Sequence, residues 1–407
     1  MTDKARAVLR SSVFLLIANV SAGALNYLFQ VRAAAQLDPA AYGALNGWMA
    51  YLSLALFVGG AAQIASNFLP WSEAGVRRVG FVTVAAPVIA LAWFGSVRAR
   101  SEAPSGLELG VVATLLGTVQ QWTLGQFQAR TWFVWMGSAV VLSAVMRWIG
   151  TFLPLFSTIA VEQAYFLALP MSFAAACLFQ GVVMLAKRAA AEPPRARSMT
   201  HGSAWMGALT LACAMSLLPQ LDMLSLRGLQ SDYELGMFAR TALFGKAVFF
   251  GALTLLQIAL PHHVRAHQGI VNPEYHRIQW LERLGIAACI VGSAVFAVSA
   301  PWITSRFLGF ELSSEQQLWV LLSCLGLTAL YGHLQAVQVL CATGEWRRAA
   351  IRLVAVAALY PVAQALGDKA SISLYLGCAL AYYSMLEIIG RLYAAVSKRR
   401  VQVARSA

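Results

Sequence analysis

The amino-acid sequence predicts an all-α polytopic membrane protein with about twelve transmembrane helices in two six-helix lobes. Three observations lead to this prediction: 59% of the 407 residues are hydrophobic, only 12% are charged, and the apolar runs are long and continuous. A soluble protein of this length needs a larger share of charged residues on its surface. The continuous runs indicate spanning helices, because a transmembrane barrel alternates apolar and polar residues over segments of about ten.

Runs of roughly 18 or more apolar residues, bounded by charged residues, proline or glycine, give the candidate spans. We expect them at 9–35, 42–69, 78–97, 107–127, 132–154, 163–186, 204–226, 235–260, 283–302, 316–341, 349–366 and 371–396. No loop between them is long enough for a folded soluble domain. The polar, proline-containing segment 187–203 follows the sixth span. We therefore divide the chain into an N-terminal lobe at 1–186, a basic cytoplasmic linker at 187–203 and a C-terminal lobe at 204–407.

Lysine and arginine residues are distributed unevenly between the two sides of the predicted membrane. If the N-terminus is cytoplasmic, most of the cations in loops and tails fall on the cytoplasmic side, which is the side they favour. We therefore predict that both termini are cytoplasmic. The net charge of +13 then reflects topology, and we expect no nucleic-acid partner. The six cysteines lie in apolar runs without metal-ligand spacing, so we expect no metal or cofactor.

The two lobes carry a related stretch at matching places. The first stretch reads "LDPAAYGALNGWMAYLSLALFVGGAAQIASNFLP" and the second "LQSDYELGMFARTALFGKAVFFGALTLLQIALP". Gly43 and Gly236 lie near the start of each, and Gln63 and Gln257 lie near the end. Six spans per lobe give both stretches the same orientation, so a pseudo-twofold axis along the membrane normal is expected, with substrate held between the lobes. A chance match of two hydrophobic helices is the alternative.

Four charged residues lie inside predicted spans, where they are expensive and usually face a cavity or each other. At 1.5 Å per residue, Asp222 and Arg240 fall within about 7 Å of the outer end on consecutive helices, and we expect them to pair. Lys246 falls near the midplane, and Arg147 falls in the outer half of its span. Lys246 and Arg147 are therefore candidates for positive charge in a substrate cavity. The alternatives are that the pair only holds a hairpin together, and that Arg147 extends to the outer interface.

Polar residues form stripes on the first two spans. Asn26 and Gln30 share one helical face of the first span, and the second span repeats polar or small residues every seven positions. These stripes predict an amide-lined cavity wall, although interhelical hydrogen bonds would give the same pattern. Arg32 falls off the stripe near the outer end, and we interpret it as an interface anchor of low priority. The candidate polar residues of the cavity are Asn26, Gln30, Asn46, Gln63 and Asn67.

Three patches of the sequence carry a family resemblance: "LNYLFQVRAAAQLDPAAYGALN" at 25–46, "QFQARTWFVWMGSAVVLSAVMRW" at 126–148 and "LLPQLDMLSLRGLQSDYELGMFARTALFGKAVFF" at 217–250. They resemble bacterial polysaccharide (O-antigen type) flippases of the multidrug/oligosaccharidyl-lipid/polysaccharide (MOP) exporter superfamily. The resemblance implies a MATE-like V-shaped, alternating-access transporter in the bacterial inner membrane. Its substrate would be a lipid-linked (undecaprenyl-phosphate type) oligosaccharide moved to the outer leaflet, with membrane lipids and the polysaccharide polymerase and export machinery as partners. The sequence departs from the family pattern at Val31, which precedes Arg32 where alanine is usual.

Two other functions remain open from the sequence. A MATE-like drug or small-molecule exporter would need an acidic cavity, and the first span lacks the acidic residue that many such exporters carry. A membrane-embedded polysaccharide polymerase or ligase would need a sizeable outer loop with catalytic groups, which the predicted topology does not provide. We therefore expect a transporter and not an enzyme. The glycan, the oligomeric state and the energy source (protons, sodium or membrane potential) are not determined by the sequence.

Overall fold

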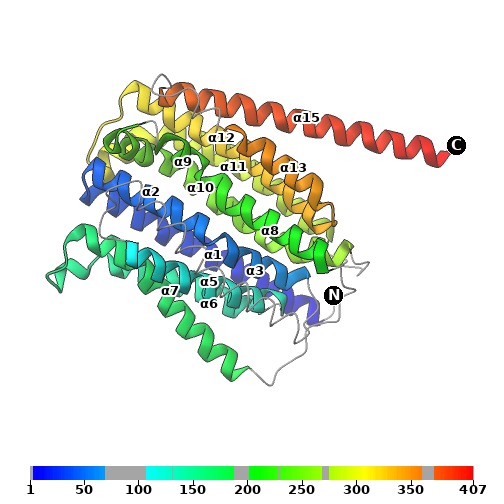
Figure 1. The fold of residues 1–407 in the computed structure, drawn as a ribbon, viewed down its shortest axis with the longest axis horizontal. Helices are drawn as coiled ribbons and strands as arrows, with labels where there is room; N and C mark the ends of the chain where they lie inside the picture. The colour runs from blue at the N-terminus through cyan, green and yellow to red at the C-terminus, as the bar shows by residue number, and fades with distance from the viewer. Residues whose placement is uncertain are drawn as a thin grey trace.

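The structure is a computed structural model that describes residues 3–68, 107–130, 132–187, 201–227, 230–267, 275–359 and 371–406. Within these ranges every regular element is helical, as predicted, and the helices lie side by side in one bundle (Figure 1). Eight described helices are long and apolar enough to cross a membrane, and a bent helix pair makes up to nine. The chain is therefore a multi-pass membrane protein.

The first half of the chain folds into helices that match the expected spans. Asp38 begins the second span: its carboxylate accepts a hydrogen bond from the Ala41 N–H at 2.9 Å, and Pro39 occupies the first helical turn, where it is well tolerated. This span is bent by 41° where α2 meets α3. The expected span at 78–97 lies outside the described residues. The helices are α1 (Asp3–Gln36), α2 (Pro39–Ala55), α3 (Phe57–Phe68), α5 (Leu107–Ala129), α6 (Phe133–Gly150) and α7 (Val161–Ala186).

The second half follows the same pattern with one interruption. The predicted span 204–226 is broken by a 3₁₀ turn, η2 (Leu218–Gln220), because Pro219 cannot donate the helical hydrogen bond. Most of the predicted linker and the end of the span at 349–366 lie outside the described residues. The last helix continues past the predicted end and projects from the bundle (Figure 1). The helices are α8 (His201–Leu217), α9 (Leu221–Arg227), α10 (Asp232–His267), α11 (Tyr275–Ile303), α12 (Ser314–Ala342), α13 (Trp346–Ala357) and α15 (Ile372–Ser406).

The two repeated stretches lie against each other at the centre of the bundle, where α2 packs along α10. A Cβ atom added to Gly43 would lie 2.9 Å from the Gly236 backbone nitrogen, and one added to Gly236 would overlap the Pro39 carbonyl. The backbones can approach this closely only because both residues lack a side chain. We call this end of the bundle the Pro39 end. Corresponding positions of the two repeats are thus in direct contact.

We call the contact of α2 and α3 with α10 the seam. The end of the seam opposite Pro39 is held by amide side chains. Gln63 of α3 donates to the Gln128 Oε1 at 3.4 Å, and Gln128 of α5 donates to the Gln257 carbonyl of α10 at 3.0 Å. Gln63 and Gln257 are the corresponding glutamines of the two repeats, and both are contacted by Gln128. We call this the Arg130 end, after the residue that follows α5. The first and second halves of the chain therefore touch at both ends of the seam.

The glycine contact predicts a position-specific effect of alanine within one helix. Gly236→Ala should destabilise the protein by about 1–3 kcal/mol, because the new methyl group overlaps the Pro39 carbonyl and α10 must shift. Gly251→Ala, in the same helix, is the control: nothing lies within 4 Å of the added atom, so better helix propensity should leave stability unchanged or slightly higher. The measurement is the temperature at which purified protein loses its monodisperse elution peak. Equal midpoints for both variants would contradict the close contact.

Candidate functional site

The interior of the first half of the bundle holds a cation without an acidic partner. Arg147 of α6 donates from Nη1 to the Asn26 Oδ1 of α1 at 3.0 Å, and its guanidinium carbon lies 5.7 Å from the Phe173 ring centroid. Its Nε is buried and has no hydrogen-bond partner. Among the described residues Arg147 forms no ion pair. The side chain is thus directed against α1 and α7, and it retains an unused donor.

Other buried donors on α1 and α2 also lack acceptors. They are the Asn19 amide nitrogen, the Tyr27 hydroxyl and the Trp48 indole nitrogen. Trp48 packs edge-on against Phe166 at 5.2 Å between centroids and belongs to the same apolar cluster as Phe173. Sequence reasoning missed Tyr27 and Trp48, since an aromatic residue in an apolar run does not reveal whether its polar atom is paired. On α1 and α2 the buried polar side-chain atoms without partners are all able to donate, which suits a ligand with oxygen acceptors, while Gln180 of α7 leaves both its amide nitrogen and its amide oxygen unpaired.

Most of the predicted polar cavity residues connect helices. Gln30 accepts a hydrogen bond from the Tyr42 hydroxyl at 3.0 Å and its amide nitrogen lies 3.3 Å from the Met49 sulfur, which joins α1 to α2. Asn46 donates to the Tyr42 carbonyl of its own helix at 3.0 Å. Gln63 belongs to the seam with Gln128, and the side chain of Asn67 lies outside the described part. Asn26 is the predicted amide that is seen bonded to a predicted cavity charge, Arg147.

The predicted pairing of Asp222 with Arg240 is wrong, because Asp222 pairs with Lys246. The Lys246 Nζ lies 3.3 Å from the Asp222 carboxylate, and both side chains are 16% exposed. The depth estimate compared backbone positions alone and left out the reach of a lysine side chain. The long lysine side chain then reaches from α10 to α9. Lys246 is consequently not the unpaired cavity cation that the sequence suggested.

Arg240 instead joins α10 to the end of α1. Its Nη2 donates to the Leu37 carbonyl at 2.9 Å, and its guanidinium lies 5.2 Å from the Phe310 ring centroid. The last carbonyls of a helix lack intrahelical partners and carry partial negative charge, so a buried arginine is stabilised there. Arg32 lies close by on α1, with its guanidinium carbon 4.0 Å from the Phe152 ring centroid and its Nε buried without a partner. Both arginines are held by backbone or aromatic groups, and the Arg240 Nε is likewise buried without a hydrogen-bond partner.

The second half also contains a buried charged cluster that the sequence did not suggest. Fully buried His333 of α12 accepts from the Arg352 Nε at 3.1 Å, and its other ring nitrogen lies 2.8 Å from the Tyr383 carbonyl. Arg352 of α13 also pairs with Glu387 of α15. These residues are far apart in the sequence, so no local spacing could reveal them. The cluster ties three helices together with its charges compensated.

The buried histidine beside α11 is compensated as well. His263 of α10 lies 2.7 Å from the Glu282 carboxylate of α11, and both side chains are 5% exposed. In the described part of the chain, no group of three or more His, Cys, Asp or Glu side chains is arranged to hold a metal ion. The described acids in the interior of the second half are therefore matched by cations or histidines, whereas Arg147 is not matched by an acid.

The comparisons with known proteins identify the fold. No protein-family model matches the sequence, and a search of curated proteins found no match. Solved structures do match over nearly the whole chain. An outward-facing multidrug resistance MATE family transporter of the MOP superfamily has a TM-score of 0.66 at 13% identity, covering 100% of this chain and 98% of that one. The chain therefore has the MATE transporter fold, as the resemblance predicted.

Two further structures support the same fold. A mutant of the Vibrio cholerae MATE transporter VcmN has a TM-score of 0.68 at 14% identity, covering 98% of this chain and 99% of that one. A MOP superfamily transporter from Pyrococcus furiosus has a TM-score of 0.65 at 12% identity, covering 95% and 96%. At these identities the comparisons establish architecture, and the substrate has to be argued from the residues.

The Asp222–Lys246 ion pair predicts a specific pattern of double substitutions. Asp222→Asn should lower stability by about 1–3 kcal/mol, because it leaves the Lys246 ammonium without its counter-ion in a mostly buried position. The double variant Asp222→Asn with Lys246→Gln should be milder than the single one. Asp222→Asn with Arg240→Gln should show no such recovery. If it did, the result would support the Asp222–Arg240 pair and contradict the Asp222–Lys246 pair. Thermal denaturation of the purified variants gives the coupling energies.

Proposed function

We propose that this protein is an alternating-access transporter that flips a lipid-linked (undecaprenyl-phosphate type) oligosaccharide from the cytoplasmic to the outer leaflet of a bacterial inner membrane. The proposal takes the MATE fold as its frame and assigns the cytoplasmic side to the Arg130 end by the positive-inside rule. Such a substrate carries a phosphate and a sugar headgroup through the protein while its chain stays in the lipid. The protein must supply charge and hydrogen bonds, and no nucleophile is needed.

The observation that carries the proposal is the unmatched positive charge of Arg147. It lies on the inner side of α6 against Asn26, with one donor unused, and the described structure gives it no carboxylate. A cationic drug would be repelled by this arrangement, whereas a phosphate would supply the missing acceptors. Asp222 does not restore an acidic site, because Lys246 already neutralises it. The balance of interior charge therefore favours an anionic substrate.

The neighbouring donors give the headgroup further hydrogen-bonding groups. Tyr27 and Trp48 combine an apolar ring with an unpaired polar atom, which is the chemistry that sugars require from a binding surface. Gly23 on the same helix has no atom within 4 Å of where a side chain would begin. We assign the phosphate to Arg147 and the sugar to the face of α1 that runs through Asn19, Gly23 and Asn26.

A drug or small-molecule exporter is the second candidate, because most of the solved structures named here are described as MATE proteins, one of them as a multidrug resistance transporter. The Pyrococcus furiosus transporter, in contrast, is described as having a binding pocket of reversed polarity that suggests a different function. That description supports the idea that this fold accommodates pockets of either polarity. A polymerase or ligase is disfavoured, since the matching structures are transporters and an outer catalytic loop is not expected.

Substitution of Arg147 tests the proposed function. Arg147→Gln should lower the flipping rate by roughly tenfold or more, the effect of losing one charge-assisted contact to phosphate, and Arg147→Lys should retain part of it. The measurement is the fraction of undecaprenyl-linked repeat unit that stays in the inner leaflet of cells expressing each variant at equal membrane levels. Arg283→Gln, an exposed cation on α11, is the control for a simple loss of charge.

Deletion of the gene separates the candidate functions. The flippase predicts that the lipid-linked repeat accumulates on the inner leaflet and that cells keep their resistance to cationic dyes. An exporter of drugs predicts the reverse, with normal glycan and increased dye sensitivity. A repeat unit that reaches the outer leaflet but stays unpolymerised would point to a polymerase and would overturn the proposal.

A further inference from the structure

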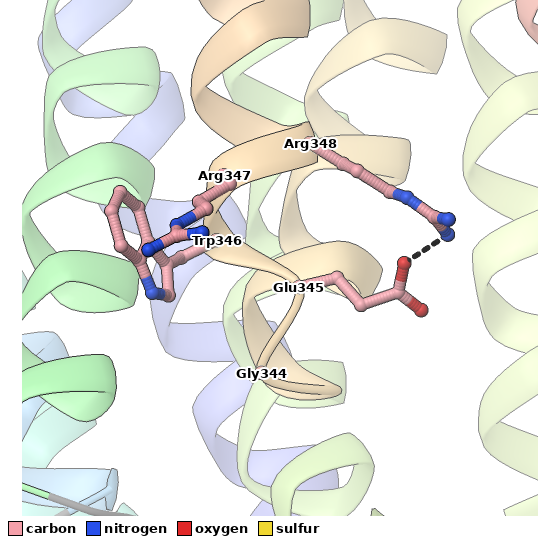
Figure 2. A pocket seen from close by; sticks show the side chains of 5 residues that line it. All are labelled: Gly344, Glu345, Trp346, Arg347 and Arg348. Carbon is pink, nitrogen blue, oxygen red and sulfur yellow. Dashed lines mark hydrogen bonds and ion pairs between the residues drawn. The ribbon is translucent and has the colours of Figure 1, made fainter.

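The turn between α12 and α13 forms a hollow on the surface at the Arg130 end. The hollow has a volume of about 530 Å³ and is lined by Gly344, Glu345, Trp346, Arg347 and Arg348 (Figure 2). Gly344 adopts a left-handed conformation with φ of 80°, which turns the chain sharply into α13. Figure 2 shows Trp346 and Arg347 on one side of this turn and Glu345 with Arg348 on the other. Nothing in the proposed transport site uses these residues.

The hollow offers positive charge that is available to a ligand. Arg347 is exposed and stacks over Trp346 at 5.5 Å from the ring centroid, and it forms no ion pair among the described residues. Arg348 pairs with Glu345 three residues away, with the side chains 60% and 43% exposed. An ion pair this exposed is weak and easily exchanged. Glu345 makes no side-chain cap, so the first N–H groups of α13 also remain available.

An apolar stripe continues from this charge along α13. Ile351 and Val354 follow Arg347 at steps of four and three residues, which places all of them on one helical face. Both apolar side chains are strongly exposed, at 70% and 68%. In a protein that crosses the membrane, such a surface faces lipid chains. A cationic hollow at a helix end thus lies directly beside a lipid-facing stripe.

We propose that this hollow binds the headgroup of an anionic glycerophospholipid. The phosphate would be held by Arg347 and the start of α13, and the acyl chains would lie along Ile351 and Val354. Arg348 would turn toward the phosphate from its exposed pair with Glu345 on the other side of the turn (Figure 2). A free phosphate would use the cations but not the apolar stripe. Because Arg347 and the stripe lie on the same face of α13, a ligand with both a phosphate and acyl chains fits better, and we commit to the lipid. Trp346 supports this assignment, since tryptophan favours the level of the headgroups. The proposal does not depend on the transported substrate.

The test compares lipid binding to the full-length protein in a neutral detergent. Wild-type protein should bind phosphatidylglycerol in preference to phosphatidylcholine. Arg347→Gln with Arg348→Gln should weaken phosphatidylglycerol binding by about tenfold or more, because two cations near the headgroup are lost. Lys187→Gln with Arg283→Gln removes the same charge from exposed positions outside the hollow, and it should change the affinity by less than about twofold. Native mass spectrometry during lipid titration gives the affinities.

Two further arms make the proposal falsifiable even if the double variant folds poorly. Glu345→Gln frees Arg348 from its pair and should strengthen phosphatidylglycerol binding; an unchanged or weaker affinity would overturn the assignment of the headgroup. Glycerophosphoglycerol, which has the headgroup without the chains, should bind much more weakly than the lipid. Equal binding of this soluble headgroup, or equal loss in the control variant, would overturn the role of the stripe or of the hollow.

Discussion

The contact between Gly43 and Gly236 is the constraint on which the centre of the bundle depends. It lets α2 and α10 begin at the same place with their backbones touching, and each glycine comes from one of the two repeated stretches. Once the two helices are fixed there, the Leu37 carbonyl at the end of α1 comes within reach of Arg240. At the opposite end the same pair of helices brings Gln63 and the Gln257 carbonyl to Gln128. The Gly43–Gly236 contact thus determines how α2 and α10 align along their whole length.

Most charged side chains in the interior have a compensating partner, because a buried charge is hydrated poorly and is costly without one. Arg240 uses a helix end, Lys246 uses a carboxylate, and Arg352 uses a carboxylate together with a histidine. Arg147 has an amide oxygen and an aromatic ring as its partners, and its Nε, like the Nε atoms of Arg32 and Arg240, is buried without a partner. An incompletely satisfied buried cation is costly in a purely structural role. A binding role would account for Arg147, because an anionic substrate would supply the charged partner that it lacks.

The sequence was sufficient for the fold because hydrophobic length alone defines spanning helices, and the described helices follow the predicted ranges closely. Depth along a helix was less reliable. Counting residues from the start of the seventh predicted span placed Asp222 opposite Arg240, but backbone depth leaves out the reach of a lysine side chain, and the partner of Asp222 is Lys246. The polar stripe on the first span was read from helical periodicity, and periodicity cannot distinguish a side chain that joins helices, such as Gln30, from one that holds a charge, such as Asn26. Partners distant in sequence, as in the His333 cluster, leave no local pattern.

A transporter of the proposed kind must open the seam at one end at a time, and the two ends differ in how this could happen. At the Pro39 end the backbones are in contact through glycine, and separating them loses this close packing, which no side chain at either glycine can replace. At the Arg130 end the halves are joined by glutamine side chains, with donor–acceptor distances of 3.4 and 3.0 Å. Amide side chains exchange a protein partner for water at little net cost, because the hydrogen bonds lost are replaced. The Arg130 end, assigned to the cytoplasm, is therefore the end that the physical chemistry allows to open first, toward the leaflet in which the proposed substrate is made.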